Sequence, residues 1–285
     1  MILLDGKETA LAVRQEIAAS VAAATAGGRR PPGLAVILAG EDPASQIYVR
    51  NKEKACLETG VIPFSFNLPA TASQAELLDI IRDCNARRDV DGILLQLPLP
   101  GGLDAAACLL SIDPAKDVDG FHPENVGRLS LGLPGIAPCT PAGVMELLCR
   151  YNLSPAGKKA VVVGRSNIVG KPLTMLLYRH GTDATVTVCH SRTRGLTREC
   201  RNAEFLFLAM GRPGMVTGEM VRDGAVVVDI GINRTVAGLC GDAHFASVSL
   251  KARALTPVPG GVGPMTIAML MKNTVQSWKN RTAVS

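Results

Sequence analysis

The chain has 285 residues, which at about 150 residues per domain predicts roughly two domains. Hydrophobic residues make up 47% of it and charged residues 19%, and a chain this apolar can bury a large core, so intrinsic disorder is excluded. Aromatic residues are only 4%, and the net charge of +5 is carried without a long basic run. This balance fits a small anionic ligand at least as well as a polymer, and we expect no nucleic-acid partner.

The eight cysteines show no sign of a metal site or of a disulfide framework. None forms a CxxC pair, and no group of cysteines and histidines has zinc spacing, so we expect no metal. Their apolar or helical surroundings predict reduced, mostly buried thiols in a cytoplasmic protein. Residues 1–7 lack the pattern of a signal peptide, and no run of 18 apolar residues predicts a membrane span.

Short apolar runs alternate with helical patterns in the first hundred residues. The patterns predict strands over 34–38, 61–67 and 91–95, and helices over 9–25, 44–59 and 73–86. We expect Gly60 to end the second of these helices. The order indicates a βαβαβ unit. The stretch 111–139 is rich in Pro, Gly and Asp and is predicted to be a long loop, which in a compact protein usually has a function.

A second series of elements follows this stretch. A helix is predicted to begin at Thr140-Pro141 and another near residue 170, and the last helix is predicted over 264–278. Strands are predicted over 160–163, 184–189, 204–208 and 225–229, with helices between most of them. Alternation in both halves predicts parallel sheets with helices on their faces, and therefore an α/β fold.

A glycine-bounded loop between a predicted strand and a helix has the position of a dinucleotide loop. Gly164 would allow a tight turn, and Gly170 would open a helix whose N–H groups can approach a phosphate. The spacing is GxSxxxG instead of GxGxxG, and a plain strand-to-helix turn remains the alternative. The loop is therefore a candidate phosphate-binding site.

The end of the next strand indicates which dinucleotide would bind. Folds that bind NAD place an acidic residue there to hold the ribose 2′-OH, but this strand is followed by His190 and Ser191. Arg165, Ser191 and Arg192 could instead hold a 2′-phosphate, which favours NADP. The alternative is that both arginines are ordinary surface residues.

Candidate chemical groups lie in the first half. Tyr48 and Lys52 are four residues apart and share one face of a predicted helix. A lysine that faces a closed pocket can transfer protons, although a solvated helix charge is the alternative. Gln96 follows a predicted strand, where α/β sheets form ligand crevices. A carboxylate within Asp117-Val118-Asp119-Gly120 could accept two N–H bonds from a pterin-like ring edge, or could form an Asx turn.

A segment rich in proline and glycine, residues 256–266, leads into the last helix. Its prolines fix φ, and its glycines permit a close approach of the backbone. Exposed amides at the start of a helix form a natural ligand cradle, and a structural hinge is the alternative.

Together, these segments resemble the bifunctional methylenetetrahydrofolate dehydrogenase/methenyltetrahydrofolate cyclohydrolase family. The resemblance covers essentially the whole chain, and several of its motifs are long and specific. The matching stretches are Tyr48–Lys52, Gln96–Pro100, Lys116–Phe121, Pro138–Pro141, Gly164–Pro172, Gly231–Arg234 and Pro257–Thr266.

The resemblance implies a fold and an activity. Residues 1–139 would form an α/β folate-binding catalytic domain, residues 140–263 a Rossmann-type NADP-binding domain, and the C-terminal helix, 264–285, would return to the first domain. The family oxidises 5,10-methylene-tetrahydrofolate with NADP and hydrolyses the 5,10-methenyl product to 10-formyl-tetrahydrofolate, both in one interdomain cleft. Tetrahydrofolate derivatives are then the expected substrates, and a homodimer is the expected assembly.

The resemblance also implies roles for single residues. Lys52 would be the acid/base residue, Gln96 would bond to it and tune its pKa, Tyr48 would pack on the folate ring, and Asp119 would anchor the pterin. Further substrate-binding residues would be Leu95, Leu97, Pro259, Gly260, Gly261, Val262 and Gly263. The cofactor site would contain Gly164, Arg165, Ser166, Ser191 and Ile232.

Two other interpretations stay open. The first is a catalytically silent nucleotide-binding module, against which the retained Lys52, Gln96 and Asp119 argue. The second is a monofunctional NAD(P) dehydrogenase of similar build, such as a shikimate-type enzyme, which leaves the segment 259–263 unexplained. His244 departs from the family, which commonly has Asp there, but it lies outside the matching motifs.

Overall fold

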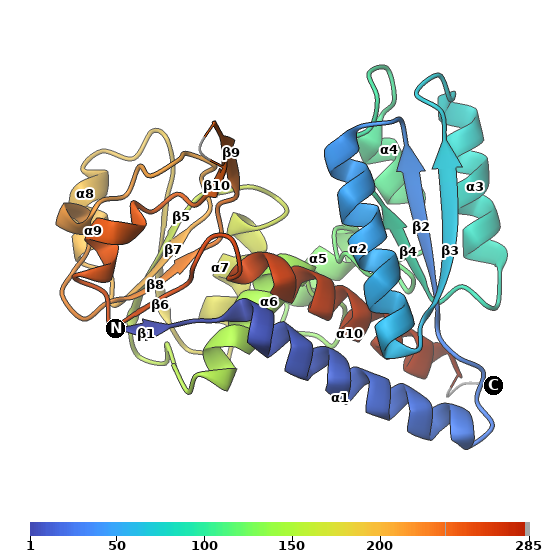
Figure 1. Cartoon of the computed structure of the whole chain (residues 1–285), viewed down its shortest axis with the longest axis horizontal. Helices are drawn as coiled ribbons and strands as arrows, with labels where there is room; N and C mark the ends of the chain where they lie inside the picture. Colours follow the sequence, from blue (N-terminus) through green and yellow to red (C-terminus); the bar gives the residue numbers. More distant parts are fainter. Residues whose placement is uncertain (237, 283–285) are drawn as a thin grey trace. The chain divides into compact units, whose positions relative to one another are not determined.

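The structure is a computed structural model that describes residues 1–236 and 238–282. The chain divides into two compact α/β units, shown in Figure 1. Unit 1 consists of Met1–Ala10, Leu129–Pro134 and Thr140–Thr266. Unit 2 consists of Leu11–Arg128, Gly135–Cys139 and the described chain from Ile267 onward. Two long helices, α1 (Gly6–Ala26) and α10 (Val262–Thr282), begin in unit 1 and end in unit 2.

Unit 2 contains a parallel sheet of three strands in the order β3-β2-β4. The strands are β2 (Gly33–Ala39), β3 (Ile62–Leu68) and β4 (Gly92–Leu95), and the helices that follow them are α2 (Pro43–Thr59), α3 (Gln74–Ala86) and α4 (Ala105–Ser111). The chain passes from β2 to β3 on one side and then to β4 on the other. The carboxyl ends of β2 and β4 therefore form a topological switch point, where ligands bind in open α/β sheets.

Local signals determine the ends of the helices in unit 2. Asp42 caps α2 by accepting a hydrogen bond from the Ser45 N–H at 2.8 Å. Gly60 follows α2 with a φ of 74°, a left-handed conformation that favours glycine, so the predicted end of this helix is confirmed. Ser73 and Glu76 form a capping box at the start of α3.

The core of unit 2 lies where α3 packs against the sheet. Leu77, Ile81 and Cys84 are buried and lie at i, i+4 and i+7, so they share one face of the helix. They pack with buried side chains of the strands, among them Ile37 and Ile93. The predicted helix over 73–86 is therefore confirmed.

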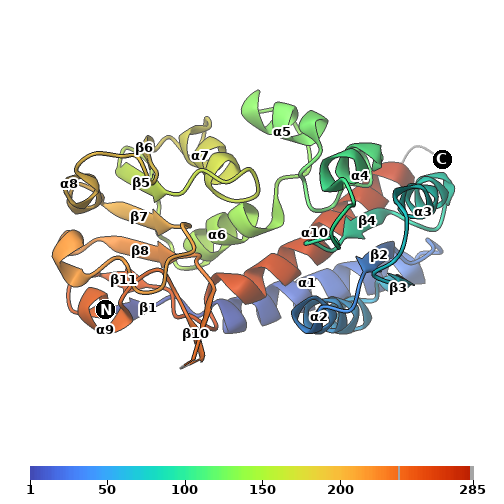
Figure 2. The same cartoon turned by 90° about the horizontal axis from the view of Figure 1, so that it is seen from above.

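Unit 1 contains a sheet of six parallel strands in the order β1-β11-β8-β7-β5-β6 (Figure 2). Its strands are β1 (Ile2–Leu3), β5 (Lys159–Val163), β6 (Thr185–Cys189), β7 (Phe205–Leu208), β8 (Val226–Asp229) and β11 (Ala254–Leu255). Its helices are α6 (Cys139–Arg150), α7 (Gly170–Tyr178), α8 (Leu196–Arg201) and α9 (Phe245–Ser249), and β9 (Asn233–Thr235) pairs with β10 (Gly238–Cys240). The switch point of this sheet lies between β5 and β7, so the α/β prediction is confirmed in both units.

Two differences between the structure and the prediction concern the stretch 111–139 and the N-terminus. The stretch 111–139 contains helix α5 (Pro123–Ser130), so the prediction of a long loop there was wrong. Residues 1–10 group with unit 1 instead of the first half, because β1 pairs in parallel with β11. A strand of two residues carries no periodic pattern that a sequence could reveal.

Most of α10, from Ile267 onward, belongs to unit 2, as the resemblance implied. Ser277 donates to the backbone oxygens of Asp91 and Ala115, both at 2.6 Å, and Lys279 donates to Ser20 of α1 at 2.8 Å. These bonds attach the C-terminal helix to the small sheet and to α1. None of the helices in the described part of the chain has the length and hydropathy of a membrane-spanning segment.

Candidate active site

Lys52 and Gln96 meet at the switch point of the sheet in unit 2. Lys52 lies on α2, and its Nζ donates to the Oε1 of Gln96 at 2.9 Å. Gln96 directly follows β4 and is 9% exposed, and its Nε2 donates to the carbonyl of Leu97 at 2.7 Å. This second bond orients the amide so that its oxygen faces the lysine. The structure thus brings together two predicted site residues that are 44 positions apart.

Asp117 and Asp119, the two carboxylates of this segment, have different surroundings. Asp117 accepts hydrogen bonds from the N–H groups of Gly120 and His122, at 3.1 and 2.8 Å, and from the Nδ2 of Asn125 at 2.9 Å. It therefore forms the Asx turn that was one interpretation of this segment. Asp119 remains as the carboxylate that can bind a ligand.

The backbone around Asp119 is held by residues that the sequence analysis did not single out. The Cys139 thiol donates to the carbonyl of Val118 at 3.2 Å. Asn273 of α10 donates from Nδ2 to the carbonyls of Val118 and Ala137, at 2.9 and 3.0 Å. Both side chains are buried. The motif Pro138-Cys139-Thr140-Pro141 was a signal for Cys139, whereas nothing local marked Asn273.

The ionisable groups of this cluster influence one another. Burial lowers the pKa of Lys52, while the nearby Asp119 and Cys139 oppose this effect. Burial raises the pKa of Asp119, and Lys52 opposes that shift. Burial also raises the pKa of the Cys139 thiol well above its ordinary value. The result is a lysine that releases its proton more readily than a solvated one, next to a carboxyl group that keeps its proton more readily.

The other predicted substrate residues of unit 2 surround this pair. Tyr48 lies one turn before Lys52 on α2, and 43% of it is exposed, so its ring is accessible to a ligand. Leu95 is the buried last residue of β4, and Leu97 is half-buried. The lysine, the amide and the aromatic ring are thus contributed by one helix and one strand end.

The predicted substrate segment 259–263 belongs to unit 1 and to the start of α10. The carbonyl of Gly260 accepts from the Lys7 N–H at 3.0 Å. A Cβ on Gly6 would lie 1.7 Å from the carbonyl oxygen of Gly261, so the first turn of α1 packs directly on this backbone. Gly260 has a φ of 104°. The remaining members, Pro259, Val262 and Gly263, complete a segment whose shape depends on small residues.

The predicted dinucleotide loop lies at the switch point of the sheet in unit 1. A Cβ on Gly164 would lie 2.2 Å from the carbonyl oxygen of Ala209, which directly follows β7. A Cβ on Gly170 would lie 2.2 Å from the carbonyl oxygen of Gly164. The Oγ of Ser166 accepts from the N–H groups of Val169 and Gly170, at 3.2 and 3.3 Å, at the start of α7. This tight turn into a helix suits a pyrophosphate, so the backbone fits a dinucleotide.

The predicted 2′-phosphate residues lie on neighbouring loops. Arg165 follows β5, and Ser191 and Arg192 follow β6; all three are exposed. These two strands are adjacent and parallel, and the Gly164 N–H donates to the carbonyl of Cys189 at 2.9 Å. Ile232, 46% exposed, lies in the loop after β8. Cationic side chains beside the turn can bind a 2′-phosphate, which fits NADP.

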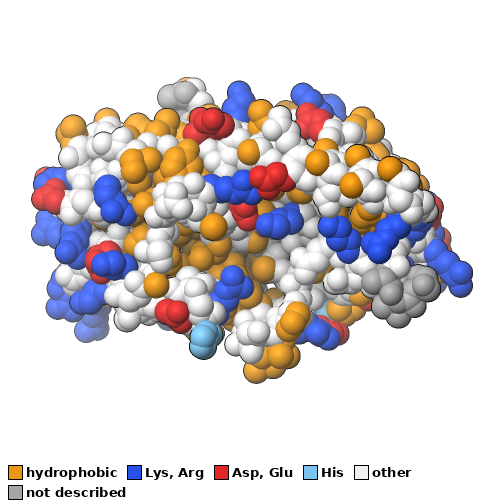
Figure 3. All heavy atoms as spheres, turned by 90° about the horizontal axis from the view of Figure 1, so that it is seen from below, with side chains coloured by type: hydrophobic (Ala, Val, Ile, Leu, Met, Phe, Trp, Pro, Cys, Tyr) orange, Lys and Arg blue, Asp and Glu red, His pale blue; other side chains and the backbone are white. Residues whose placement is uncertain are grey.

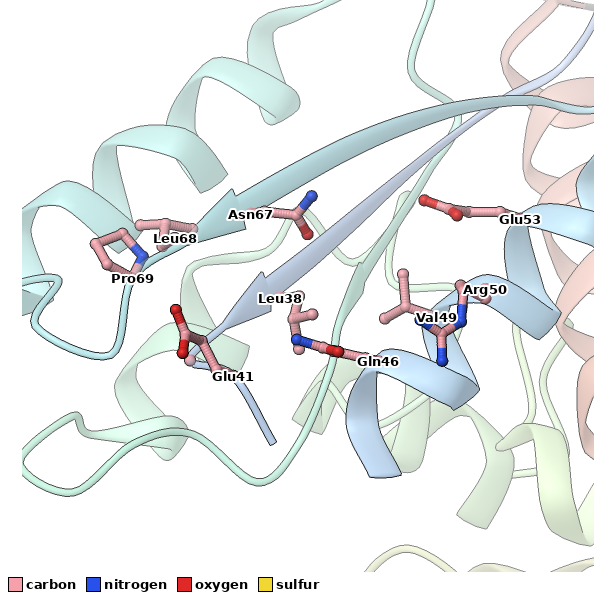
Figure 4. Close-up of a pocket in the computed structure, with 10 residues that line it drawn as sticks. Leu38, Glu41, Gln46, Val49, Arg50, Glu53, Asn67, Leu68 and Pro69 are labelled. Atoms are coloured by element: carbon pink, nitrogen blue, oxygen red, sulfur yellow. The ribbon is translucent and has the colours of Figure 1, made fainter. Parts of the chain in front are cut away.

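A separate cavity of about 490 Å³ opens at the carboxyl ends of β2 and β3 (Figure 4). Gln46, Arg50 and Glu53 line it from α2, and Asn67 lines it from β3. The described lining contains none of the predicted site residues, so this cavity is not the site built above.

Side chains that could hold a metal ion do not gather anywhere in the described part of the chain. All eight cysteines are free, and six of them are buried, so the prediction of mostly buried thiols is confirmed. On the face in Figure 3, basic and acidic side chains are interspersed.

Comparisons with known proteins agree with this geometry. Residues 4–119 match the family model "Tetrahydrofolate dehydrogenase/cyclohydrolase, catalytic domain", and residues 138–282 match the model for the "NAD(P)-binding domain" of the same family. A protein of Desulfovibrio desulfuricans named "Bifunctional protein FolD" is 73% identical over 99% of this chain and 100% of its own length.

Solved structures show the same likeness. The bifunctional FolD methylenetetrahydrofolate dehydrogenase/cyclohydrolase of Campylobacter jejuni has a TM-score of 0.95 at 47% identity, covering 99% of both chains. The FolD of Trypanosoma brucei, complexed with NADP cofactor and an inhibitor, has a TM-score of 0.94 at 39% identity, covering 99% of this chain and 98% of that one. The chain therefore belongs to the tetrahydrofolate dehydrogenase/cyclohydrolase family.

Proposed function

We propose that this protein is a bifunctional one-carbon folate enzyme. It oxidises 5,10-methylene-tetrahydrofolate with NADP to the 5,10-methenyl cation, and it hydrolyses that cation to 10-formyl-tetrahydrofolate. The observation that carries the proposal is the half-buried Lys52 bonded to Gln96 at 2.9 Å, with Asp119 close enough to shift its pKa. The names of the relatives from Desulfovibrio desulfuricans and Campylobacter jejuni support both activities.

The oxidation needs a bound dinucleotide beside the folate. NADP, when bound, supplies the nicotinamide ring that accepts a hydride from the one-carbon unit. The turn at Gly164, Ser166 and Gly170 would hold its pyrophosphate, and Arg165 and Ser191 would hold its 2′-phosphate. Ile232 would pack against the cofactor from the loop after β8. The product is already a stable cation, so this step asks little of an acid or base.

The hydrolysis requires proton transfers that Lys52 is suited to perform. Water attacks the methenyl carbon and must lose a proton, which the neutral amine of Lys52 can accept. The bond from this carbon to N5 then breaks as the formyl carbonyl forms. Of the two protons of the water, one ends on N5 and one is released to solvent. Burial favours the neutral amine by lowering the pKa of Lys52, so more of it is ready to act as a base near neutral pH.

The other residues position Lys52 and the folate. Gln96 holds the Nζ through its Oε1 and keeps the amine directed into the site. Asp119 would anchor the pterin by accepting ring N–H groups, and Tyr48 would pack against the folate ring. Leu95, Leu97 and the segment from Pro259 to Gly263 would complete the substrate site.

Two separate assays test this function. NADPH formation from 5,10-methylene-tetrahydrofolate is measured beside the same reaction with NAD, and the decay of 5,10-methenyl-tetrahydrofolate is followed independently. We expect turnover with NADP and a decay faster than in buffer alone. Oxidation without hydrolysis would indicate a monofunctional dehydrogenase, and inactivity in both assays would contradict the proposal.

We also propose that the protein is a cytoplasmic homodimer. The buried free thiols are typical of a reducing compartment. β6 is an edge strand of the sheet in unit 1, and Val188 on it is exposed, so this edge could pair with a second copy. Light scattering should give twice the 29.9 kDa mass of one chain, and a monomer at micromolar concentration would contradict the dimer. Cell fractionation tests the location.

A further inference from the structure

Two buried aspartates in unit 1 hold the loops that surround the predicted cofactor site. Asp229 is the last residue of β8 and is 3% exposed, and Asp242 follows β10 and is fully buried. Neither was a predicted site residue. Their carboxylates receive seven hydrogen bonds between them, and six of these come from backbone N–H groups.

Asp242 connects the loop after β7 with the loop after β8. Its Oδ2 accepts from the N–H groups of Met210 and Gly211, at 2.7 and 3.1 Å. Its Oδ1 accepts from the Arg212 N–H at 2.7 Å and from the Nδ2 of Asn233 at 2.9 Å. The loop 209–212 packs against Gly164, and Asn233 directly follows Ile232. One carboxylate therefore ties together the loops after β7 and β8, which lie on the β7 side of the switch point between β5 and β7.

Asp229 fixes the backbone of Asp242 through hydrogen bonds to its carboxylate. Its Oδ1 accepts from the N–H groups of Gly231 and Asp242, at 3.1 and 3.0 Å, and its Oδ2 accepts from the Ala243 N–H at 2.7 Å. A Cβ on Gly231 would lie 2.3 Å from the Asp242 carboxyl carbon, and a Cβ on Gly241 would lie 2.0 Å from the Asp229 Oδ2. The backbone therefore closes around both carboxylates and leaves no room for larger side chains.

Burying two carboxylates side by side is energetically unfavourable, because each loses its hydration. Burial and the neighbouring Asp242 charge both raise the pKa of Asp229, to about 6, although three N–H groups favour its ionised form. In an ordinary turn, neutral acceptors such as backbone carbonyls or side-chain amides would be enough to pair with the backbone N–H groups. An arrangement that keeps six backbone N–H groups on two charges fixes loop positions more narrowly, which is what a cofactor site needs.

We propose that Asp242 and Asp229 are positioning residues for NADP. They act through the loops 209–212 and 231–233, which they hold at the distance the dinucleotide requires, and they do not touch the cofactor. The inference rests on the proposed function, because it assumes that the loop from Gly164 to Gly170 binds NADP.

The test uses Asp242→Asn in the full-length protein. An asparagine has only one acceptor oxygen, so at least one pair of donors loses its partner. We expect the Kd for NADP, measured by calorimetry, to rise about tenfold or more. Hydrogen exchange of the amides of Met210, Gly211 and Arg212 should also become faster. Asn233→Ala removes a single donor, and it provides a milder variant with a smaller shift of the same sign if Asp242→Asn does not fold.

The matched control is Asp223→Asn at the other end of β8. Asp223 is exposed and pairs with Lys251 at 2.8 Å, so its change should leave the Kd for NADP and the amide exchange of 210–212 within about twofold of the original protein. An unchanged Kd, or unchanged exchange, in folded Asp242→Asn would overturn the inference. Failure of the unaltered protein to bind NADP would instead contradict the proposed function, while the exchange measurement would still report whether Asp242 holds the loop.

Discussion

Lys52 and Lys116 are both lysines of unit 2 whose pKa is lowered by burial, yet their hydrogen bonds differ. Lys116 is 1% exposed, and its Nζ donates to three backbone carbonyls at the end of α3. These acceptors, the carbonyls of Cys84, Asn85 and Arg87, lie 2.6 to 2.8 Å away. Lys52 is half-buried, and among the described residues its Nζ donates to one acceptor, Gln96.

The two lysines differ in how many N–H groups of the ammonium are hydrogen-bonded within the described part of the protein, three in Lys116 and one in Lys52. All three protons of Lys116 stabilise the C-terminus of a helix, where a cation is favoured. Lys52 keeps hydrogen-bonding capacity for a substrate or a water molecule. A buried polar group with open capacity is therefore a better indication of a site than a shifted pKa alone.

The sharpest test of this comparison is Lys52→Met. We expect the rate of hydrolysis of 5,10-methenyl-tetrahydrofolate to fall by about 10²- to 10⁴-fold, because a general base is lost. The melting temperature and the Kd for NADP should stay near those of the original protein. Lys54→Met on the same helix is the control, since Lys54 is 77% exposed. Wild-type hydrolysis in Lys52→Met would remove this residue from the mechanism.

Lys116→Met should show the opposite pattern. Three buried carbonyls would lose their donor, so we expect the free energy of unfolding to fall by about 3 kcal/mol or more. Urea denaturation measures this loss, and Lys54→Met again provides the baseline. The rate per folded molecule should change much less than in Lys52→Met. Loss of activity without loss of stability would show that open capacity does not distinguish the two lysines.

The same contrast separates two arginines. Arg30 donates from both terminal nitrogens to Asp91, at 2.7 Å, whereas Arg165 is exposed beside the dinucleotide turn. We expect Arg165→Ala to raise the KM for NADP about tenfold to 100-fold and the KM for NAD only slightly, because a bidentate phosphate contact is lost. Arg198→Ala, an exposed change in the same unit, is the control. An equal effect on NADP and NAD would contradict the 2′-phosphate assignment.

The smallest expected effect on cofactor binding concerns pH and Asp229, whose carboxylate accepts three backbone hydrogen bonds. Its pKa in the folded protein is raised to about 6 from 3.8, so the folded state holds the proton more tightly than the unfolded state. The stability that this proton provides is complete below about pH 4 and is lost as the pH rises through about 6, a loss of about 3 kcal/mol by neutral pH.

Cofactor binding should respond to this titration in the opposite direction. Protonation removes an acceptor from the loops, so the Kd for NADP should rise a few-fold as the pH falls below about 6. The 2′-phosphate of NADP titrates in the same range, so the comparison is with Asp229→Asn, in which this part of the pH dependence should disappear. Identical pH profiles for the two proteins would exclude a contribution from Asp229.

Much of the fold could be predicted because its signals are local. The helix α2 was predicted from its apolar spacing and from Gly60, and the strands β2 and β5 from their apolar runs. The strand β1 and the helix α5 were missed. β1 exists only because β11 lies beside it, and α5 lies within a stretch rich in turn-forming residues.

The structure brings two predicted residues of the candidate site, Lys52 and Gln96, into contact, but the sequence could not predict the interactions around them. The motifs contained Lys52, Gln96 and Asp119, and the resemblance implied a role for each. Neither the motifs nor the resemblance showed that Asp117 forms the turn, or that Asn273 holds the backbone near Asp119 from 155 positions away along the chain.

What the sequence by itself determined was the order of strands and helices, the ends of several helices and the glycines that a dinucleotide turn requires. These depend on neighbouring residues, whose backbone preferences act at short range. Only the tertiary structure decided which lysine is left with open capacity and which aspartates share a buried charge. Desolvation and hydrogen-bond saturation depend on groups that folding brings together, such as Lys52 and Gln96, and no local pattern encodes them.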